Sequence, residues 1–553
     1  MNAIVASPYG LSNSVKAADK LEARLYEEKL FNIIINKLNK IHNKQYSKRF
    51  WRILIGHWLR YFTEVMINRI NTFELCLKNY EIEGMAAFSN ENFSLASQNT
   101  YQAILAFDND RWNNELYYQI YQKLNANKIY IETIKFDEQK KSNTIINESK
   151  INRDKLKKRI SRIKKLFDFL IKENDIFIKS SYLSKKEEIF LFFMLKQWPQ
   201  FWLESSTEII FKHDKELRKK LSNDFNGLTS NNRFDLICAL AFENMPLCYI
   251  EGFTEMIDCA KKLPWPKRPK LILTANSFIT DEPFKYWTAL KTELETKYLV
   301  VQHGANYGTH LYIENNTIEQ ITADKFLSWG WSDPSSNTIP YVIIKKRIHK
   351  SYNIKPKYGL LLVEPEIRHR INTWDNYAEH GLHFNNQLTF ISNLEERVKK
   401  HLTVRLHPLY KEYNWFEDKR YHEYDPCLNI EYSENIEKLF RKNRLIVFSY
   451  DSTGLLQTLS GNIPTIAFWD NKLDHLVKSA QPYYQMLVNV GILHFSSESA
   501  AEIINNKWDN ISEWWRCDKV QEARLSFCNQ YARSSNYRVR KLKNILNCYS
   551  DNE

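Results

Sequence analysis

One stretch, residues 444–470, constrains the fold more than any other part of the chain. It reads RLIVFSYDSTGLLQTLSGNIPTIAFWD. The apolar run Leu445–Phe448 has the length of a buried strand. A turn rich in hydroxyl groups follows, and then a leucine pattern with helical spacing that ends at Gly461. Pro464 begins the next apolar run. A strand, a helix and a second strand in this order predict a parallel sheet.

The turn after the first of these strands points to a phosphate site. It contains Ser449, Ser452, Thr453 and Gly454. Ligands of open α/β sheets bind at the carboxyl ends of strands, and the N-terminus of a helix offers free N–H groups and a positive dipole end. The alternative is a simple helix cap, because Ser, Thr and Asp are ordinary capping residues. The residues alone leave both interpretations open.

Polar residues also follow two predicted strands further upstream, at residues 271–274 and 298–301. Consecutive parallel strands end at the same edge of a sheet, so we expect these residues at the mouth of an α/β domain. They are Asn276, Asp281, Glu282, Gln302, His303, Gly304 and Asn306.

A third strand, at residues 401–406, contains Arg405 and ends in His407-Pro408. Proline fixes its own φ and biases the preceding residue toward extended backbone, which would hold His407 at the sheet edge. An imidazole there can donate to a phosphate oxygen or act as an acid toward a departing phosphate. A histidine with a purely structural role is the alternative.

The bulk composition narrows the class of protein. The net charge of +13 suits an anionic partner: an activated nucleotide donor, an acidic glycan, a membrane surface or nucleic acid. The eight cysteines form no CxxC and no zinc-finger spacing, which predicts scattered thiols in a reduced compartment. The N-terminus lacks a signal-peptide pattern, and the longest apolar run, residues 189–195, is too short to span a bilayer. We expect a cytoplasmic protein. Its basic surface leaves a peripheral contact with the inner face of the cytoplasmic membrane open as an alternative.

The order of elements predicts two α/β domains of Rossmann-like type that face a cleft. We place the first at residues 1–335, with helical additions at its N-terminus, and the second at 336–515, after a linker rich in Ser, Asn and Pro. A helical tail at 516–553 follows. The basic run at 140–165 is interpreted as a solvated linker or helix face, with a lipid-binding surface as the alternative.

Several of these motifs resemble motifs of known protein families. His407-Pro408 with Ser449 and Ser452-Thr453 is similar to the HP and SS/ST motifs of two-domain bacterial sialyltransferases and Kdo transferases. Gln302-His303-Gly304 looks like the QHG-type loop of capsule-polysaccharide transferases. The segments LNKIHNKQYSKRFWRILIGHWL, TANSF, QHGANYG and GLLQTLSGNIPTIAFWD together resemble a family of bacterial surface-carbohydrate (O-antigen) transferases. This resemblance covers most of the chain.

The resemblance implies a GT-B-like glycosyltransferase with an N-terminal acceptor domain, a C-terminal donor domain and no metal or other cofactor. Its co-substrate would be a CMP-activated nonulosonic or Kdo-like acid, and its acceptor a glycan or lipid-linked glycan. His407 would contact the donor phosphate and assist the departure of CMP. The other implied donor-binding residues are Pro408, Ser449, Ser452, Thr453, Gly454, Gln457 and Arg405. Arg405 and Arg368 would neutralise donor charge, and the alternative is that both are surface arginines.

Two features keep alternatives open. Related donor sites often place a Glu on the helix to bind ribose, whereas this chain has Gln457, whose amide binds without a charge. A UDP- or GDP-sugar or a CDP-polyol donor therefore remains possible. The base that removes the acceptor proton is expected among His303, Asp281 and Glu282, with Asn276 orienting, although Asp281-Glu282 before Pro283 also fits a helix cap.

A non-enzymatic protein that binds nucleic acid or a membrane is a third hypothesis. It predicts basic residues focused on one groove beside aromatic side chains. Here the basic residues are dispersed and no nucleic-acid motif occurs, so we expect no nucleic-acid partner.

Overall fold

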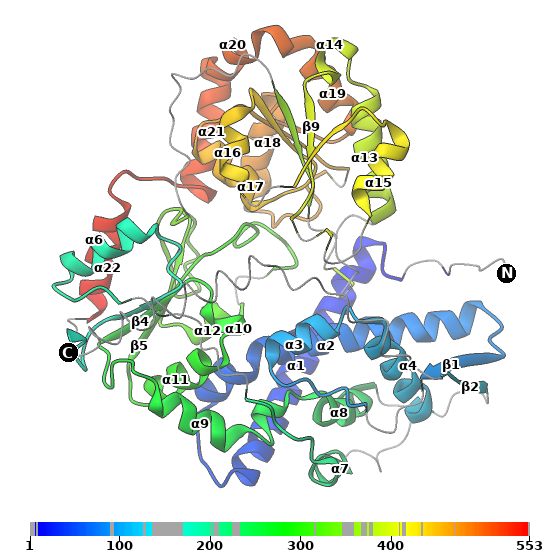
Figure 1. Ribbon diagram of the computed structural model, residues 1–553, viewed down its shortest axis with the longest axis vertical. Coiled ribbons are helices and arrows are strands. Elements are labelled where there is room, and N and C mark those ends of the chain that lie inside the picture. Colours follow the sequence, from blue (N-terminus) through cyan, green and yellow to red (C-terminus); the bar gives the residue numbers. More distant parts are fainter. Residues whose placement is uncertain are drawn as a thin grey trace.

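The computed structural model describes residues 6, 9–88, 93–124, 129–134, 170–200, 202, 209–223, 233–313, 317–345, 359–365, 373–374, 380–408, 410–411, 416–432, 435–470 and 472–550. Two parallel sheets dominate this part of the chain (Figure 1). Arg368 and the basic run at 140–165 lie outside the described residues.

The C-terminal sheet has six parallel strands in the order β10-β9-β8-β11-β12-β13. Their bounds are β8 (Leu360–Val363), β9 (Leu402–Arg405), β10 (Asn429–Glu431), β11 (Leu445–Phe448), β12 (Thr465–Phe468) and β13 (Leu493–His494). The first strand in sequence lies at the centre, and the chain then builds outward on either side of it. This is the Rossmann order, and its topological switch point lies between β8 and β11.

The N-terminal sheet has five parallel strands in the order β3-β4-β5-β6-β7. They are β3 (Phe177–Lys179), β4 (Leu271–Thr274), β5 (Lys297–Val301), β6 (Lys325–Ser328) and β7 (Thr338–Pro340). This sheet extends past residue 335, the predicted domain boundary, because β7 pairs with β6. A short edge strand that ends in proline resembles a linker in sequence, which explains the difference.

Helices cover both sheets. Those of the C-terminal domain are α13 (His380–Ser392), α14 (Glu396–Lys399), α15 (Glu417–Tyr424), α16 (Ile436–Lys442), α17 (Thr453–Ser460), α18 (Gln481–Asn489), α19 (Ser497–Lys507), α20 (Ile511–Arg516) and α21 (Asp518–Tyr531). Those around the N-terminal sheet are α6 (Lys185–Met194), α9 (Phe253–Lys262), α10 (Ser277–Thr280), α11 (Glu282–Thr292), α12 (Ile318–Thr322) and α22 (Arg538–Ser550). The last helix, α22, thus returns to the first domain, where Leu542 and Leu546 join its core.

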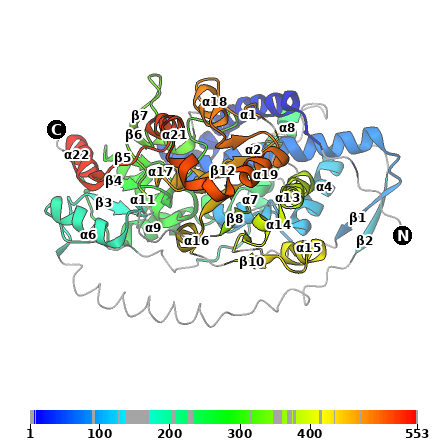
Figure 2. The ribbon, with the colours of Figure 1, turned by 90° about the horizontal axis from the view of Figure 1, so that it is seen from above.

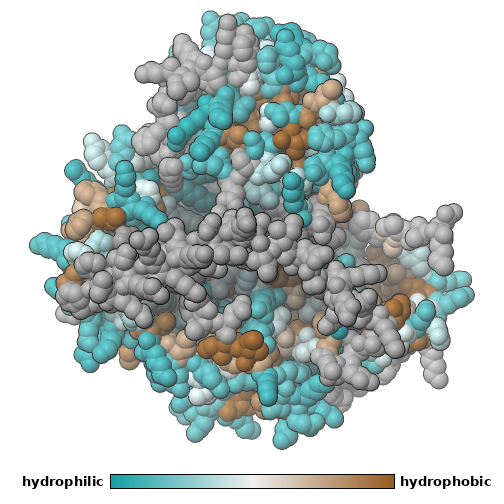
Figure 3. Space-filling view, viewed as in Figure 1, coloured by the Kyte–Doolittle hydropathy of each residue, from teal (hydrophilic) through white to brown (hydrophobic). Residues whose placement is uncertain are grey.

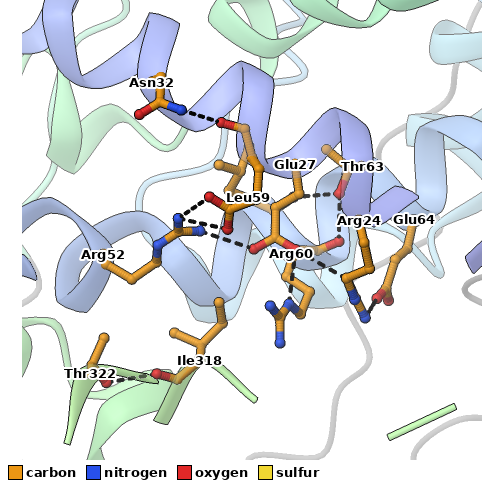
Figure 4. Close-up of polar contacts among 11 residues, drawn as sticks. Arg24, Glu27, Asn32, Arg52, Leu59, Arg60, Thr63, Glu64, Ile318 and Thr322 are labelled. Atoms are coloured by element: carbon orange, nitrogen blue, oxygen red, sulfur yellow. Dashed lines mark hydrogen bonds and ion pairs between the residues drawn. The ribbon is translucent and has the colours of Figure 1, made fainter. Parts of the chain in front are cut away.

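Long helices form the N-terminal addition. They are α1 (Asn13–Ile41) and α2 (Lys48–Asn79), with α3 (Thr100–Ala106), α4 (Asp110–Leu124), α7 (Lys215–Asn223), α8 (Arg233–Asn244) and the strand pair β1 (Gly84–Phe88) and β2 (Tyr130–Ile134). Seen from above, α1 and α2 pass beneath the C-terminal domain (Figure 2). Between them the buried Glu27 accepts from Arg24, Arg52 and Arg60 (Figure 4). The predicted fold, two Rossmann-like domains in a GT-B-like arrangement with helical additions, is confirmed.

Candidate functional site

The loops that follow β5 and β11 meet at the junction of the two domains. The amide of Ala305 donates to Oγ1 of Thr453 over 2.9 Å. Further along the same loop, the amide of Leu311 donates to the His475 carbonyl at 2.7 Å, and the Val477 amide donates to the Thr309 carbonyl at 2.8 Å. The Gln302–Gly308 loop and the Ser449–Gly454 turn are far apart in sequence, but they are in contact in the folded protein.

The turn after β11 is an N-cap as well as a candidate ligand site. Oγ of Ser452 accepts from the Leu455 amide at 3.2 Å, so the capping interpretation is confirmed for this residue. Gly454 lies against the buried ring of Phe448, where a Cβ would come within 2.6 Å of Cε1. The α-helix then begins with Thr453 and Gly454, whose amides precede the first intrahelical bond, from Leu456 to Ser452. The predicted role of these residues in holding a phosphate stays a prediction.

Ser449 belongs to a buried polar cluster at the switch point between β8 and β11. Its hydroxyl lies 3.4 Å from Nε2 of His383, and only 3% of Ser449 is exposed. Glu364, directly after β8, accepts hydrogen bonds from the hydroxyl of Tyr421 and the amide of Gln387. Burial raises the pKa of Glu364 well above its usual value. This cluster was not predicted from the sequence, although Glu364 directly follows the buried strand β8.

Three of the remaining predicted donor residues, Arg405, His407 and Pro408, lie at the same edge of the C-terminal sheet. Arg405 ends β9 and is buried, and its burial lowers the pKa of the guanidinium. His407 and Pro408 follow β9 after Leu406 and are half-buried. Gln457 lies half-buried on α17. These four residues thus come from β9, the loop that follows it, and α17. β9 pairs with β8, and α17 follows β11, the two strands that flank the switch point.

A second acid at this edge was not expected from the sequence. Asp451 is 4% exposed and accepts a hydrogen bond from the Tyr484 hydroxyl at 2.7 Å. Nε2 of His475 lies 3.7 Å from the same carboxylate. The His475 ring in turn lies 5.5 Å from that of His310, which belongs to the loop after β5. Burial lowers the pKa of His310 to about 3, so this imidazole is neutral at the domain junction.

Gln302 shapes the loop after β5 rather than facing outward. Its Oε1 accepts from the Trp329 amide at 2.8 Å and from the Trp331 indole at 2.9 Å. Its Nε2 donates to the Gly304 carbonyl at 2.8 Å. Only 1% of Gln302 is exposed. The side chain therefore ties the loop to the end of β6 and positions the residues next to it.

His303 heads a chain of polar contacts that runs into the N-terminal domain. Its Nδ1 lies 3.2 Å from the hydroxyl of Tyr307, and that hydroxyl donates to Glu319 on α12. Oε2 of Glu319 lies 3.8 Å from Nε2 of His57 on α2. Burial lowers the pKa of His303 to about 4. Because the single hydrogen of the Tyr307 hydroxyl goes to Glu319, the hydroxyl oxygen accepts from Nδ1–H of His303, and the lone pair of the neutral ring is on Nε2.

Asp281 and Glu282 are held in buried contacts inside the N-terminal domain. Asp281 caps α11 by accepting from the Phe284 amide at 3.1 Å and pairs with Lys179. Glu282 accepts from Lys285 at 3.0 Å, and it also accepts from the Tyr249 hydroxyl and the Thr100 amide. The capping interpretation of Asp281 is thereby confirmed. Among the predicted bases, His303 is the one that lies in the loop at the domain junction.

The other acceptor-side residues lie in the loops after β4 and β5. Asn276 is half-buried at the start of α10. Asn306 has a φ of +75°, a left-handed conformation that Asn tolerates better than most residues. Its Oδ1 is buried and finds no hydrogen-bond partner among the described residues. Gly304 faces Thr453, with room for a Cβ at 3.5 Å from Oγ1.

A pocket of about 660 Å³ lies next to this junction, between α1, α2 and the end of the β5 loop. Three basic residues, Lys20, Arg24 and Arg60, line it together with Glu27 and Glu28, and Glu27 pairs with both arginines. Nζ of Lys20 donates to the Leu311 carbonyl at 2.7 Å, which connects the pocket to the loop.

Comparison with protein families decides the class of protein. A family model described as "LIC12162 family transferase" matches residues 2–546. The chain belongs to the LIC12162 transferase family. The predicted transferase class is therefore confirmed, while the sugar and the nucleotide stay predictions. A search of curated proteins found no match.

Among solved structures, this family member is similar to the wall teichoic acid polymerase TagF, with 10% identity, a TM-score of 0.34, and 73% of this chain and 98% of that chain covered. It is also similar to HepE from Anabaena in complex with UDP and glucose, with 9% identity, a TM-score of 0.34, and 69% and 100% covered. MurG from Acinetobacter baumannii shows 13% identity and a TM-score of 0.30, with 53% and 77% covered. In the described part of the chain, no helix combines the length and apolar character needed to span a bilayer.

Proposed function

We propose that this transferase is a glycosyltransferase of surface-polysaccharide biosynthesis. Its donor would be a nucleotide-activated sugar, with a CMP-linked nonulosonic or Kdo-like acid as the first candidate, and its acceptor a glycan or lipid-linked glycan. The observation that carries the proposal is the contact between Ala305 and Thr453, because it brings a candidate base loop beside a candidate phosphate site. A reaction between two substrates requires such a junction.

The donor phosphate would bind at the carboxyl edge of the C-terminal sheet. The N-terminus of α17 supplies N–H groups and the positive end of a helix dipole. Arg405 adds a buried positive charge at the end of β9, and His407 follows it. Thr453 and Ser452 already hydrogen-bond within the protein, so we assign phosphate contacts to the amides of this turn before its hydroxyls.

The acceptor hydroxyl would lose its proton to His303. In a single displacement the acceptor oxygen attacks the anomeric carbon, the bond from that carbon to the phosphate oxygen breaks, and its electron pair leaves with the nucleotide. Nε2 of His303 takes the acceptor proton, since Nδ1–H is held by Tyr307. His407 would donate a hydrogen bond to the departing phosphate.

Nucleotide titration tests the donor site. We would follow the thermal unfolding midpoint of the wild type, His407→Ala and the control His422→Ala, which lies exposed on α15, with CMP, UMP, GDP and CDP. Selective stabilisation by CMP that is lost in His407→Ala alone supports the proposal. A preference for UMP or GDP keeps the transferase but overturns the CMP donor. No stabilisation by any nucleotide overturns the donor site.

Gln457 is the reason to assay a second class of donor directly. An amide in place of a carboxylate recognises a ribose without a charge-assisted bond, which leaves room for a UDP- or GDP-sugar or a CDP-polyol. Since a CDP-polyol that transfers its polyol phosphate also releases CMP, CMP binding alone does not separate it from a CMP-sugar. Comparing the turnover of a CMP-linked ulosonic acid with that of CDP-glycerol separates the two donor classes, because only the true donor is consumed in the presence of acceptor.

A further inference from the structure

The solvent-facing side of α6 carries aromatic side chains. Leu191 and Phe192 pack into the core of the N-terminal sheet, whereas Phe190 and Phe193 are 48% and 60% exposed. Residues three apart lie on the same side of a helix, so these two rings form one apolar stripe. In Figure 3 apolar side chains gather at the left edge of the molecule, over α6. Single exposed apolar residues are ordinary, but an apolar stripe of this kind indicates an interaction surface.

One further aromatic residue follows the stripe. Trp198, just after α6, is 41% exposed. Trp combines an apolar ring with a polar group, and it is enriched where a bilayer meets water. Together Phe190, Phe193 and Trp198 form what we call the α6 aromatic surface.

The exposed charges of this surface are positive. Lys185, Lys186 and Lys196 are exposed. The two carboxylates of α6 are bound to the protein instead: Glu187 pairs with Arg538 at 2.7 Å, and Glu188 accepts from the Ser181 hydroxyl at 3.2 Å. Among the described residues of α6 and its flanks, the exposed charges around the α6 aromatic surface are therefore lysines.

The neighbouring helix extends the positive charge. α22 lies beside α6 in both ribbon views (Figures 1 and 2) and packs on it. Its sequence, RVRKLKNILNCYS, contains no Asp or Glu. Arg540 and Lys541 are exposed on it, so the helix packed against α6 also carries exposed positive charge.

We propose that the α6 aromatic surface docks on an anionic lipid bilayer. Phe190 and Phe193 would enter the headgroup region, while the lysines of α6 and the basic residues of α22 approach lipid phosphates. Basic helices with an exposed aromatic face lie in the plane of a membrane surface in this way, and each nearby Lys or Arg adds attraction to anionic lipid. The chain carries a net charge of +13, and an anionic bilayer attracts a protein of positive charge. The inference does not depend on the proposed reaction.

Sedimentation of the full-length protein with lipid vesicles tests this inference. We expect binding to vesicles of phosphatidylcholine mixed with phosphatidylglycerol, weaker binding at high salt, and little binding to phosphatidylcholine alone. Replacing both rings, Phe190→Ser with Phe193→Ser, should weaken binding about tenfold, because apolar side chains leave the membrane. The charge reversal Lys185→Glu with Lys186→Glu should weaken it too. A matched control, Leu294→Ser with Leu525→Ser, removes side chains that are 69% and 48% exposed elsewhere and should leave binding unchanged.

Several outcomes would overturn the inference. They are equal binding to neutral and anionic vesicles, no binding to either, or equal loss in the control pair and in the phenylalanine pair. Sedimentation velocity without lipid adds another. If the wild type is a dimer and the variant with Phe190→Ser and Phe193→Ser is a monomer, the surface binds a second copy of the chain. Unchanged thermal unfolding midpoints of all variants would show that the folded state is intact, as expected for exposed positions.

Discussion

The backbone amide of Ala305 donates a hydrogen bond to the hydroxyl of Thr453 over 2.9 Å, across 148 positions of sequence. This bond joins the loop after β5 of the N-terminal sheet to the helix that follows β11 of the C-terminal sheet. Each loop lies at the carboxyl end of its strand, the edge at which parallel sheets bind ligands. The two sheets therefore present their functional edges to each other, with one hydroxyl as a direct connection.

Removing the Thr453 hydroxyl tests this connection. Thr453→Val keeps the shape of the side chain but leaves the Ala305 N–H without its acceptor, which should cost about 1 kcal/mol of stability. We also expect a higher KM for the nucleotide donor, because the start of α17 loses a contact that positions it. Chemical unfolding and steady-state kinetics measure the two effects. Thr453→Ser retains the hydroxyl and should behave like the wild type; a Ser variant as impaired as the Val variant would contradict the prediction.

Tyr307 should affect kcat because its hydroxyl positions the ring of His303. Tyr307→Phe removes the oxygen that holds Nδ1–H of His303, so the ring loses its fixed tautomer. We expect kcat to fall by about 10²-fold, the scale of general-base catalysis, with little change in donor KM. His303→Gln should show the same pattern. Kinetic assays with the identified donor measure both.

The control for this prediction is another buried tyrosine. Tyr286 donates its hydroxyl to the Cys248 carbonyl at 2.7 Å in the same domain, away from the β5 loop. Tyr286→Phe reports the general effect of deleting a buried hydroxyl and should leave kcat near the wild-type value. If Tyr286→Phe lowers kcat as much as Tyr307→Phe does, the effect is structural and the role of Tyr307 is wrong.

Gly454 and Gly304 form a matched pair at the junction. An alanine Cβ at 454 would lie 2.6 Å from the fully buried ring of Phe448, whereas at 304 the nearest atom lies 3.5 Å away. Overpacking a core of this kind costs about 1–3 kcal/mol. We therefore expect Gly454→Ala to lower the free energy of unfolding by that amount and Gly304→Ala to leave it nearly unchanged. Denaturant titration of both variants decides; equal stability of the two would refute the packing argument.

The strands and their functional ends were predictable from sequence for a physical reason. Parallel strands are covered on both faces, so Leu271–Thr274, Leu445–Phe448 and Thr465–Phe468 are short apolar runs bounded by turns. Residues directly after such runs must lie at one sheet edge. His407 and the turn from Ser449 to Gly454 could be placed there before any coordinates were known.

The partners of the site residues could not be predicted, because they come from distant parts of the chain. Nothing local marks His383 as the neighbour of Ser449, or Glu319 as the acceptor for Tyr307. Asp281 and Glu282 illustrate the converse. A carboxylate before a helix looks the same whether it caps or catalyses, and only the tertiary contacts of Asp281 with Lys179 and of Glu282 with Tyr249 show that both are held in buried contacts.

Glu417 should make stability depend on pH near neutrality. It lies at the start of α15, 2% exposed, and Oε2 has no hydrogen-bond partner among the described residues. Burial raises the pKa of this carboxyl to about 7, against the usual 4.5 of the unfolded chain. Between these two values the unfolded chain releases its proton while the folded protein keeps it. The stability that the neutral acid contributes is therefore complete below about pH 4.5 and is lost as the pH rises through about 7.

The side chain of Glu417→Gln stays neutral at every pH, so this variant should not lose stability as the pH rises. At about pH 8 the variant should be more stable than the wild type by about 3 kcal/mol at most, and the difference should vanish toward about pH 4.5. Denaturant titrations across this range measure it. Glu423→Gln, at an exposed position on the same helix, is the control and should follow the wild-type curve. A constant difference between Glu417→Gln and the wild type across the range would mean that Glu417 is ionised in the folded protein throughout.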